Sequence, residues 1–240
     1  EDDAGSRTLG ENVNHCTTYS YGTDPTSDLK IDQIELTAAG SRGRAVWKGT
    51  VVGHIELQVP GKHNLLNAAG TLALAMALEL NPAAFLSGLH SFRGAGRRFE
   101  LKATVNGIRV IDDYGHHPVE LKATLSALRG AYPEKRMVLI FQPHRYTRTR
   151  DLFDDFVSVL SDVDQLIITE VYPAGEKPIA LADGRALVRA IRLQGNENAI
   201  FAEDIVDAKR KLFNILQQDD LVVTMGAGSV GKLPAMLNND

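Results

Sequence analysis

Apolar and polar residues alternate in short stretches over residues 17–59, and this pattern predicts β-strands joined by turns. The stretches read TTYSYG, LKIDQIEL, RAVWKGT and VVGHIELQV. After Pro60 the period changes, because leucines, alanines and a methionine recur at helical spacing in a segment that stops before Pro82. We expect a helix there, followed by a second short helix that reaches about His90.

Beyond residue 92 the pattern predicts strands and helices that take turns. The segment FELKATVNGIRVIDD predicts a pair of strands. Further strands are expected over residues 136–141, 165–171, 199–202 and 221–225. Helices are expected over residues 119–130, 151–161, 183–193 and 204–217, with a last helix at the end of the chain. The strands MVLIF and QLIITEV are apolar throughout, which is typical of strands buried on both faces of a parallel sheet.

These patterns predict an α/β protein of two parts. The segment SFRGAGRR, residues 91–98, contains two glycines and three arginines and is typical of a linker or hinge. Residues 1–92 are expected to form a strand-rich α/β region. The alternating series over residues 93–240 predicts a Rossmann-like, doubly wound domain.

Composition and charge exclude several classes of protein. The 240 residues are 44% hydrophobic and 23% charged, which argues against disorder, collagen-like repeats and coiled coils. Lys and Arg number 26 against 30 Asp and Glu, and the net charge of −4 predicts no general affinity for nucleic acid or anionic membranes. No apolar run approaches the ~20 residues of a membrane helix, and no secretory pattern is present.

The cysteine content and the first residue add two expectations. Cys16 is the only cysteine, which excludes an internal disulfide and suits the reducing cytosol, so a cytoplasmic protein is expected. The sequence begins at Glu1 and not at a methionine. We therefore expect it to be a segment of a longer polypeptide.

Ligands of open α/β sheets bind beyond the carboxyl ends of the strands, so the loops after strands are the places for chemistry. The first such loop, residues 112–118, reads DDYGHHP. Its carboxylates can accept bonds from ribose hydroxyls, and its histidines can donate to phosphate or carboxylate oxygens. An aspartate cap with surface histidines is the alternative. A metal site is disfavoured, because no third ligand is spaced to join the two histidines.

Two further loops carry candidate chemistry. Residues 142–150 read QPHRYTRTR, and three arginines at a strand end suit a carboxylate or phosphate. A solvated basic turn balanced by nearby aspartates is equally compatible with this composition. Residues 226–231 read GAGSVG, a literal GxGxxG. Too few residues follow to complete a dinucleotide site, so a close-packed turn is the preferred interpretation.

The first half of the chain offers one candidate, the segment GKHNLLN at residues 61–67. Asn64 and Asn67 lie one helical turn apart, where their amides can contact a base edge or water. An asparagine cap beside a partly exposed His63 is the alternative. No GxxxxGK[ST] occurs in the sequence, so this chain has no P-loop for a nucleoside triphosphate.

Five strings together resemble the ATP-dependent Mur ligase family: GKHNLLNAAG, FRGAGRRFE, VIDDYGHHPVELKATL, FQPHRYTRTRDLFDDF and EVYPAGEKPI. The similarity extends from about residue 17 to the end of the chain. Members have a UDP-sugar domain, a central P-loop ATPase domain and a Rossmann-like C-terminal domain. The resemblance implies that residues 1–92 end the central domain and that residues 93–240 form the C-terminal one. The P-loop and the acidic Mg²⁺ ligand would then lie in upstream domains of the same polypeptide, and this chain alone would be inactive.

The last three strings are most similar to the members that use ATP and Mg²⁺ to join L-alanine to UDP-N-acetylmuramate. By that resemblance, the residues that contact the nucleotide are His63, Asn64, Asn67, Arg98 and Asp113, with Arg98 at a phosphate and Asp113 at the ribose. Those that line the amino-acid and acyl-phosphate side are Tyr114, His116, His144, Arg145 and Arg148. Among these, His116 and Arg148 are the expected catalytic residues, and Arg145 or Arg148 would hold the alanine carboxylate. No general base is assigned, and the hinge at residues 93–96 would let the C-terminal domain rotate onto ATP.

Two alternatives stay open at this point. The nearest is the family member that attaches a recycled murein tripeptide to the same sugar nucleotide. By the same resemblance its loop reads Phe-Ala where this chain has Tyr114-Gly115, and its hinge reads RRLE where this chain has RRFE. The other is a catalytically silent module that binds nucleotide or substrate. An incomplete central sheet would expose an unpaired strand edge, which leaves self-association open.

Overall fold

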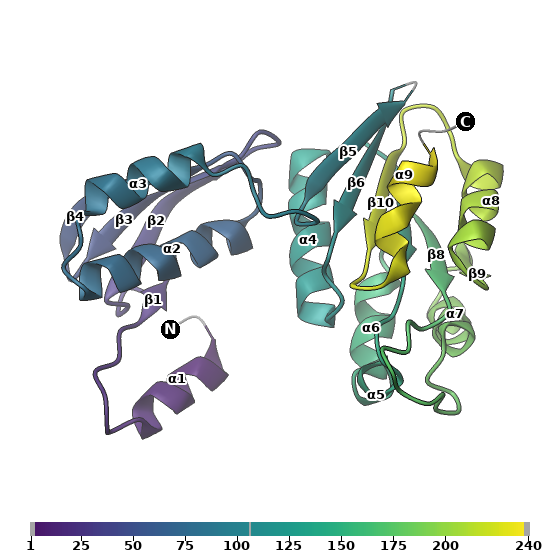
Figure 1. The fold of residues 1–240 in the computed structure, drawn as a ribbon, viewed down its shortest axis with the longest axis horizontal. Coiled ribbons are helices and arrows are strands. Elements are labelled where there is room, and N and C mark those ends of the chain that lie inside the picture. Colours follow the sequence, from purple (N-terminus) through teal and green to yellow (C-terminus); the bar gives the residue numbers. More distant parts are fainter. Residues whose placement is uncertain (1–2, 106, 238–240) are drawn as a thin grey trace. The chain divides into compact units, whose positions relative to one another are not determined.

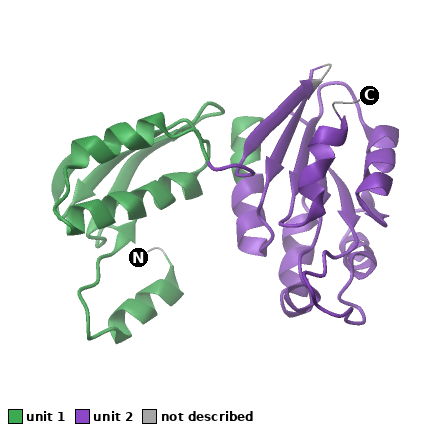
Figure 2. Cartoon of the chain, viewed as in Figure 1, with its two compact units in different colours: residues 1–94, 126–132 green, residues 95–125, 133–240 purple. Residues whose placement is uncertain are grey.

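The computed structural model describes residues 3–105 and 107–237, and the chain divides into two compact units (Figures 1 and 2). The first unit comprises residues 1–94 and 126–132, and the second comprises residues 95–125 and 133–240. The division between Gly94 and Ala95 falls inside the predicted linker. Which domains of a larger enzyme these units represent stays a prediction.

The first unit is a four-stranded sheet packed against two helices. Its strands are β1 (Tyr21–Gly22), β2 (Leu29–Leu36), β3 (Ser41–Trp47) and β4 (Thr50–Leu57), in that order across the sheet. Only the β1–β2 pair is parallel. The two helices packed against the sheet are α2 (Lys62–Ala77) and α3 (Pro82–Ser91), and a further helix, α1 (Ala4–Asn12), precedes the first strand. Alternate strand residues such as Leu29, Ile31 and Ile55 pack with Leu65 and Leu72 of α2 in one core, which confirms the predicted switch from strand to helical period.

The second unit is a six-stranded, mostly parallel sheet. Its strands are β5 (Glu100–Val105), β6 (Ile108–Asp113), β7 (Met137–Phe141), β8 (Gln165–Thr169), β9 (Ala199–Ala202) and β10 (Leu221–Met225). Their order is β5-β6-β10-β7-β8-β9, and only β5 runs antiparallel to its neighbour. The α/β fold class is therefore confirmed, and β10 returns to the middle of the sheet between β6 and β7.

Helices cover both faces of this sheet (Figure 1). They are α4 (Pro118–Ala131), which belongs to this unit only as far as residue 125, α5 (Tyr146–Asp151), α6 (Phe153–Leu160), α7 (Gly184–Leu193), α8 (Ile205–Ile215) and α9 (Leu233–Leu237). Val138 and Ile140 of β7 share a core with Leu212 of α8, whereas the ring of Phe141 on the other face lies 5.6 Å from that of Phe156. None of the described helices is long and apolar enough to cross a membrane.

Two helices differ from the sequence prediction. Helix α1 was not predicted, and none of its residues is buried. Residues 146–150 were expected in a loop, but α5 begins at Tyr146, which places Arg148 on a helical turn. The residue before this helix is Arg145, whose side chain makes no capping bond. The capping group is instead the carboxylate of Glu176, which accepts the Thr147 amide at 3.0 Å.

Candidate functional site

The carboxyl ends of four strands of the second unit meet at one edge of its sheet. Met225 at the end of β10 lies opposite Asp113 of β6 and Phe141 of β7, and Phe141 lies opposite Ile168 of β8. The loops after these four strands therefore converge. This is the place where an open α/β sheet binds its ligands.

Four aromatic rings from three of these loops form a row along the edge. The rings of Tyr114 and His116 are 5.4 Å apart, those of His116 and His144 are 5.5 Å apart, and those of His144 and Tyr172 are 5.4 Å apart. The last pair is stacked with an interplanar angle of 10°. The structure thus brings three of the predicted site residues together and adds Tyr172, which lies in the string EVYPAGEKPI and had no role assigned to it.

Two of the predicted arginines adjoin this row. One guanidinium nitrogen of Arg148 donates to the carbonyl oxygen of His144 at 3.0 Å and lies 3.4 Å from its Nδ1. Arg145 is exposed, and its guanidinium lies 3.6 Å from the Glu176 carboxylate. Burial lowers the pKa of His144, and the charges of His116, Arg148 and Arg145 lower it further. The lowered pKa favours the neutral ring of His144, which can accept or donate a hydrogen bond.

Glu120, at the start of α4, organises the loop that carries His116. Its carboxylate accepts the backbone amides of His116 at 3.0 Å and His117 at 3.1 Å. Arg98 donates to its other oxygen at 3.3 Å. Burial alone would raise the pKa of Glu120, but the bonds from the two amides and the charge of His116 outweigh burial, so the pKa lies below its usual value.

The residue beside the predicted phosphate ligand Arg98 has a structural role. Arg97 donates from Nε to the buried carboxylate of Asp112 at 2.7 Å and from a terminal nitrogen to the Gly226 carbonyl at 2.7 Å. The other oxygen of Asp112 accepts the Thr224 hydroxyl at 2.7 Å. Arg98 itself is exposed; within the described residues its side chain makes a surface pair with Glu120 and a cation–π contact, 5.7 Å from the Tyr114 ring. It is thus accessible to a ligand.

Asp113, the predicted ribose ligand, is buried and engaged by the backbone. One carboxylate oxygen accepts the Gly115 amide at 2.7 Å, and the other accepts the Phe99 amide at 2.9 Å. A carboxylate has about four acceptor positions, so these two bonds leave some unused. Its ribose role stays a prediction.

The three nucleotide residues predicted in the first half lie on the first turns of α2, within the first unit. Asn64 and His63 are half-buried, and Asn67 is exposed. The Asn64 amide donates to the carbonyl oxygen of Pro60 at 2.8 Å, so it helps to close the start of the helix. The exposed amide of Asn67 is accessible to a ligand. Contact of these residues with a nucleotide stays a prediction.

The glycines after β10 serve close packing, as the preferred interpretation required. A Cβ on Gly228 would lie 2.7 Å from Cγ of Tyr172, and one on Gly226 would lie 2.7 Å from the Gln142 carbonyl oxygen. The Gln142 side chain accepts the Val230 amide at 3.0 Å. The segment that follows is a single 3₁₀ turn, Ser229–Lys232.

Sequence reasoning assigned no individual role to five residues that shape the site: Arg97, Asp112, Glu120, Tyr172 and Glu176. All five lie in the strings that carry the family resemblance, and Asp112 is one of the carboxylates of the loop DDYGHHP. Glu120 has a further local signal, because His117-x-x-Glu120 at the start of a helix has the spacing of a capping box. In the described part of the chain, no three His, Cys, Asp or Glu side chains are placed together to hold a metal ion. The involvement of Mg²⁺ therefore rests on the resemblance alone.

Comparisons with known proteins identify the family of the chain. Residues 97–228, more than half of the chain, match the family model described as Mur ligase, glutamate ligase domain. The chain is 49% identical over 226 residues to the UDP-N-acetylmuramate–L-alanine ligase of Laribacter hongkongensis and 50% identical over 227 residues to that of Neisseria meningitidis. Each match covers 91% of this chain and 48% of the relative, so the chain spans about half the length of these relatives.

Solved structures show the same likeness. The crystal structure of UDP-N-acetylmuramate-alanine ligase from Thermotoga maritima aligns with a TM-score of 0.75 and 25% identity, over 92% of this chain and 47% of that one. A murein peptide ligase from Psychrobacter arcticus aligns with a TM-score of 0.64 and 20% identity, over 92% and 46% of the two chains, and shares the fold.

Proposed function

The chain belongs to the Mur ligase family, and from this premise we propose that it supplies the amino-acid side of an ATP-dependent ligase that joins L-alanine to UDP-N-acetylmuramate. The observation that supports this most is the row of Tyr114, His116 and His144 beside Arg148, in a chain about half identical to relatives of that name. Because the sequence contains no P-loop and spans half of those relatives, we propose that further residues bind the ATP phosphates and the UDP-sugar.

In the proposed reaction, an oxygen of the muramoyl carboxylate attacks the terminal phosphorus of ATP, and ADP leaves. The amine of L-alanine then attacks the carbonyl carbon of the acyl phosphate, the new C–N bond forms, and phosphate leaves with the electrons of the C–O bond. The amine loses a proton in this step. Negative charge develops on oxygen as the tetrahedral intermediate forms, and fixed cations beside the reacting carbon lower the barrier by stabilising that charge.

The contacts favour Arg148 over Arg145 as the ligand of the alanine carboxylate. Arg145 already faces the Glu176 carboxylate at 3.6 Å. Among the described residues, the side-chain contacts of Arg148 are those of one terminal nitrogen with His144. The rest of its guanidinium fork can bind a carboxylate. The ring of His144 beside Arg148 can donate a further hydrogen bond to the alanine carboxylate, and it places no negative charge next to that carboxylate.

The matched pair Arg148→Ala and Arg150→Ala tests this role, since both residues lie on α5 and Arg150 is exposed with a surface partner, Asp151. The assay is ATP-dependent phosphate release by the complete polypeptide that contains this sequence. Losing a charged hydrogen bond costs about 1.5 to 3 kcal/mol, so Arg148→Ala should lower kcat/KM for L-alanine by roughly 10- to 150-fold. Arg150→Ala should leave it unchanged. Equal kinetics for both variants would remove Arg148 from the site.

We also propose that Asn67 and its neighbours His63 and Asn64 contact the nucleotide, together with Arg98 and Asp113. Asn67→Ala is the cleanest test, because the side chain is exposed and its loss should not disturb folding. A raised KM for ATP at an unchanged KM for L-alanine would support the assignment. An unaltered KM for ATP in both Asn67→Ala and Asp113→Ala would refute it.

A further inference from the structure

The loop after β7 contains a strained residue that bonds within the loop do not fully account for. Arg145 has a φ of 71°, in the left-handed region that costs a residue with a side chain about 1 to 3 kcal/mol. It is also the N-cap residue of α5 and makes no side-chain cap bond. Contacts from elsewhere must therefore hold this loop, and with it the predicted substrate residues His144, Arg145 and Arg148.

The first of these contacts comes from Tyr172, just beyond the end of β8. Its amide donates to the carbonyl oxygen of Pro143 at 2.8 Å, and its carbonyl oxygen accepts the Arg145 amide at 2.9 Å. These two bonds form a parallel bridge that pairs His144 with Tyr172 and stacks the two rings. Gly228 packs against Tyr172 so closely that a Cβ there would lie 2.7 Å from Cγ of the tyrosine.

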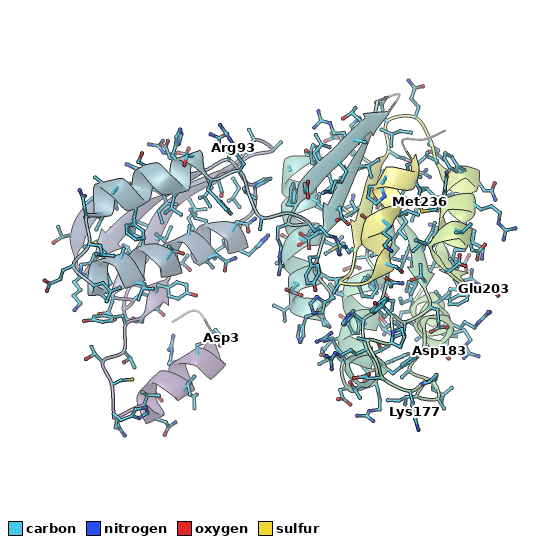
Figure 3. All side chains as sticks on the ribbon, in the orientation of Figure 1. Asp3, Arg93, Lys177, Asp183, Glu203 and Met236 are labelled. Atoms are coloured by element: carbon cyan, nitrogen blue, oxygen red, sulfur yellow. The ribbon has the colours of Figure 1, made fainter. Side chains whose placement is uncertain are left out.

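The second contact comes from Glu176 in the same loop, next to Lys177, which Figure 3 labels. The Glu176 carboxylate accepts both the amide of Thr147 at 3.0 Å and its hydroxyl at 2.8 Å. It thereby satisfies an amide in the first turn of α5 that the sequence leaves without a cap. It also faces the Arg145 guanidinium at 3.6 Å and places one negative charge among the cations of the site.

We propose that Tyr172 and Glu176 are positioning residues for L-alanine, which hold the loop of residues 143–148 so that His144 and Arg148 face the amino acid. This inference rests on the proposed function. Neither residue acts on the reacting atoms. Tyr172 orients His144 through the stack and the bridge, and Glu176 fixes the helical turn that carries Arg148.

The kinetic test uses the complete polypeptide with ATP, UDP-N-acetylmuramate and L-alanine. Glu176→Ala should raise the KM for L-alanine by about tenfold, since it removes two hydrogen bonds to a charged group. Glu176→Gln, whose amide oxygen can still accept the Thr147 amide, should recover most of that loss. Tyr172→Ala should raise the same KM by about two- to tenfold through loss of the ring pair, whereas Tyr172→Phe should behave as wild type. The KM for ATP should not change in any variant.

Glu197→Gln is the matched control, because Glu197 is exposed and precedes β9 at the opposite edge of the sheet. It should leave both KM values unchanged. Suppose that the wild-type enzyme uses L-alanine. The inference is then overturned if Glu176→Ala and Tyr172→Ala both have the wild-type KM for L-alanine. It is equally overturned if those variants change the KM for ATP as much as that for L-alanine, because that result indicates general loss of structure.

A second measurement separates this inference from the proposed function. Amide hydrogen exchange of the 240-residue chain should show faster exchange at Thr147 in Glu176→Ala than in wild type, with Glu197→Gln unchanged. If the wild-type enzyme does not use L-alanine, the proposed function fails. Faster exchange at Thr147 in Glu176→Ala would still show that Glu176 holds the loop of residues 143–148, which would then serve a different ligand. Unchanged exchange at Thr147 would overturn the positioning role itself.

Discussion

Replacing Arg97 should destabilise the second unit far more than replacing the adjacent Arg98. The carboxylate of Asp112 is 0% exposed and the Arg97 side chain 26% exposed, whereas Arg98 and Glu120 are 45% and 33% exposed. Removing one partner of a buried ion pair costs about 3 to 5 kcal/mol, and the partial exposure of Arg97 places Arg97→Ala near the lower end. Arg98→Ala breaks a surface pair worth about 0 to 1 kcal/mol.

The assay is hydrogen exchange at the amides of β7 and β10, which reports the free energy of opening of the second unit. Fluorescence of Trp47, the only tryptophan, monitors the first unit in parallel. The variant Arg97→Ala/Asp112→Asn should be more stable than Arg97→Ala alone, because the amide removes the unpaired buried charge. Equal losses of stability in Arg97→Ala and Arg98→Ala, or no recovery of stability in the double variant, would refute the stabilising role of the Arg97–Asp112 ion pair.

Three further predictions concern contacts of the second unit. Gly228→Ala should lower the stability of that unit, because a Cβ there meets packed atoms. Gly130→Ala, a control in the part of α4 that belongs to the first unit, places its Cβ with no heavy atom within 4 Å and should be neutral or stabilising; equal urea midpoints for the two variants would contradict this. Because the pKa of Glu120 is lowered in the folded state, its ionised form stabilises the fold at neutral pH, and this contribution is lost as the pH falls through the folded-state pKa. The difference in stability between wild type and Glu120→Gln should therefore shrink from pH 7 to about pH 3. A difference that stays constant would rule out this contribution of Glu120. His144 should titrate below about 6.5 in an NMR experiment, because burial and neighbouring cations lower its pKa, and Arg148→Ala should raise the midpoint; an unmoved midpoint would argue against the contact.

Most of the fold could be predicted because its signals are local. The apolar run of β7 and the helical spacing in α2 each follow from a few neighbouring residues. Helix α5 was missed because its cap, Glu176, lies 29 positions from Thr147. The order of the strands is likewise non-local, and no nearby residue indicates that β10 inserts between β6 and β7.

The candidate site could be predicted in part for the same reason. Loops after parallel strands share an edge, so Tyr114, His116 and His144 come together as expected, although their role stays a prediction. Sequence alone could not distinguish Arg97 from Arg98, since they are adjacent and chemically identical. What separates them is burial against Asp112, a contact that exists only once β5 and β6 have paired.

The most direct test of the central claim is ATP-dependent phosphate release by the complete polypeptide that contains this sequence, with UDP-N-acetylmuramate and either L-alanine or a murein tripeptide. The 240-residue chain alone is measured beside it. We predict release by the complete polypeptide with L-alanine, none with the tripeptide, and none from the chain alone. Release with the tripeptide in place of L-alanine would assign the chain to the other ligase, and no release with either amine would contradict the proposed function.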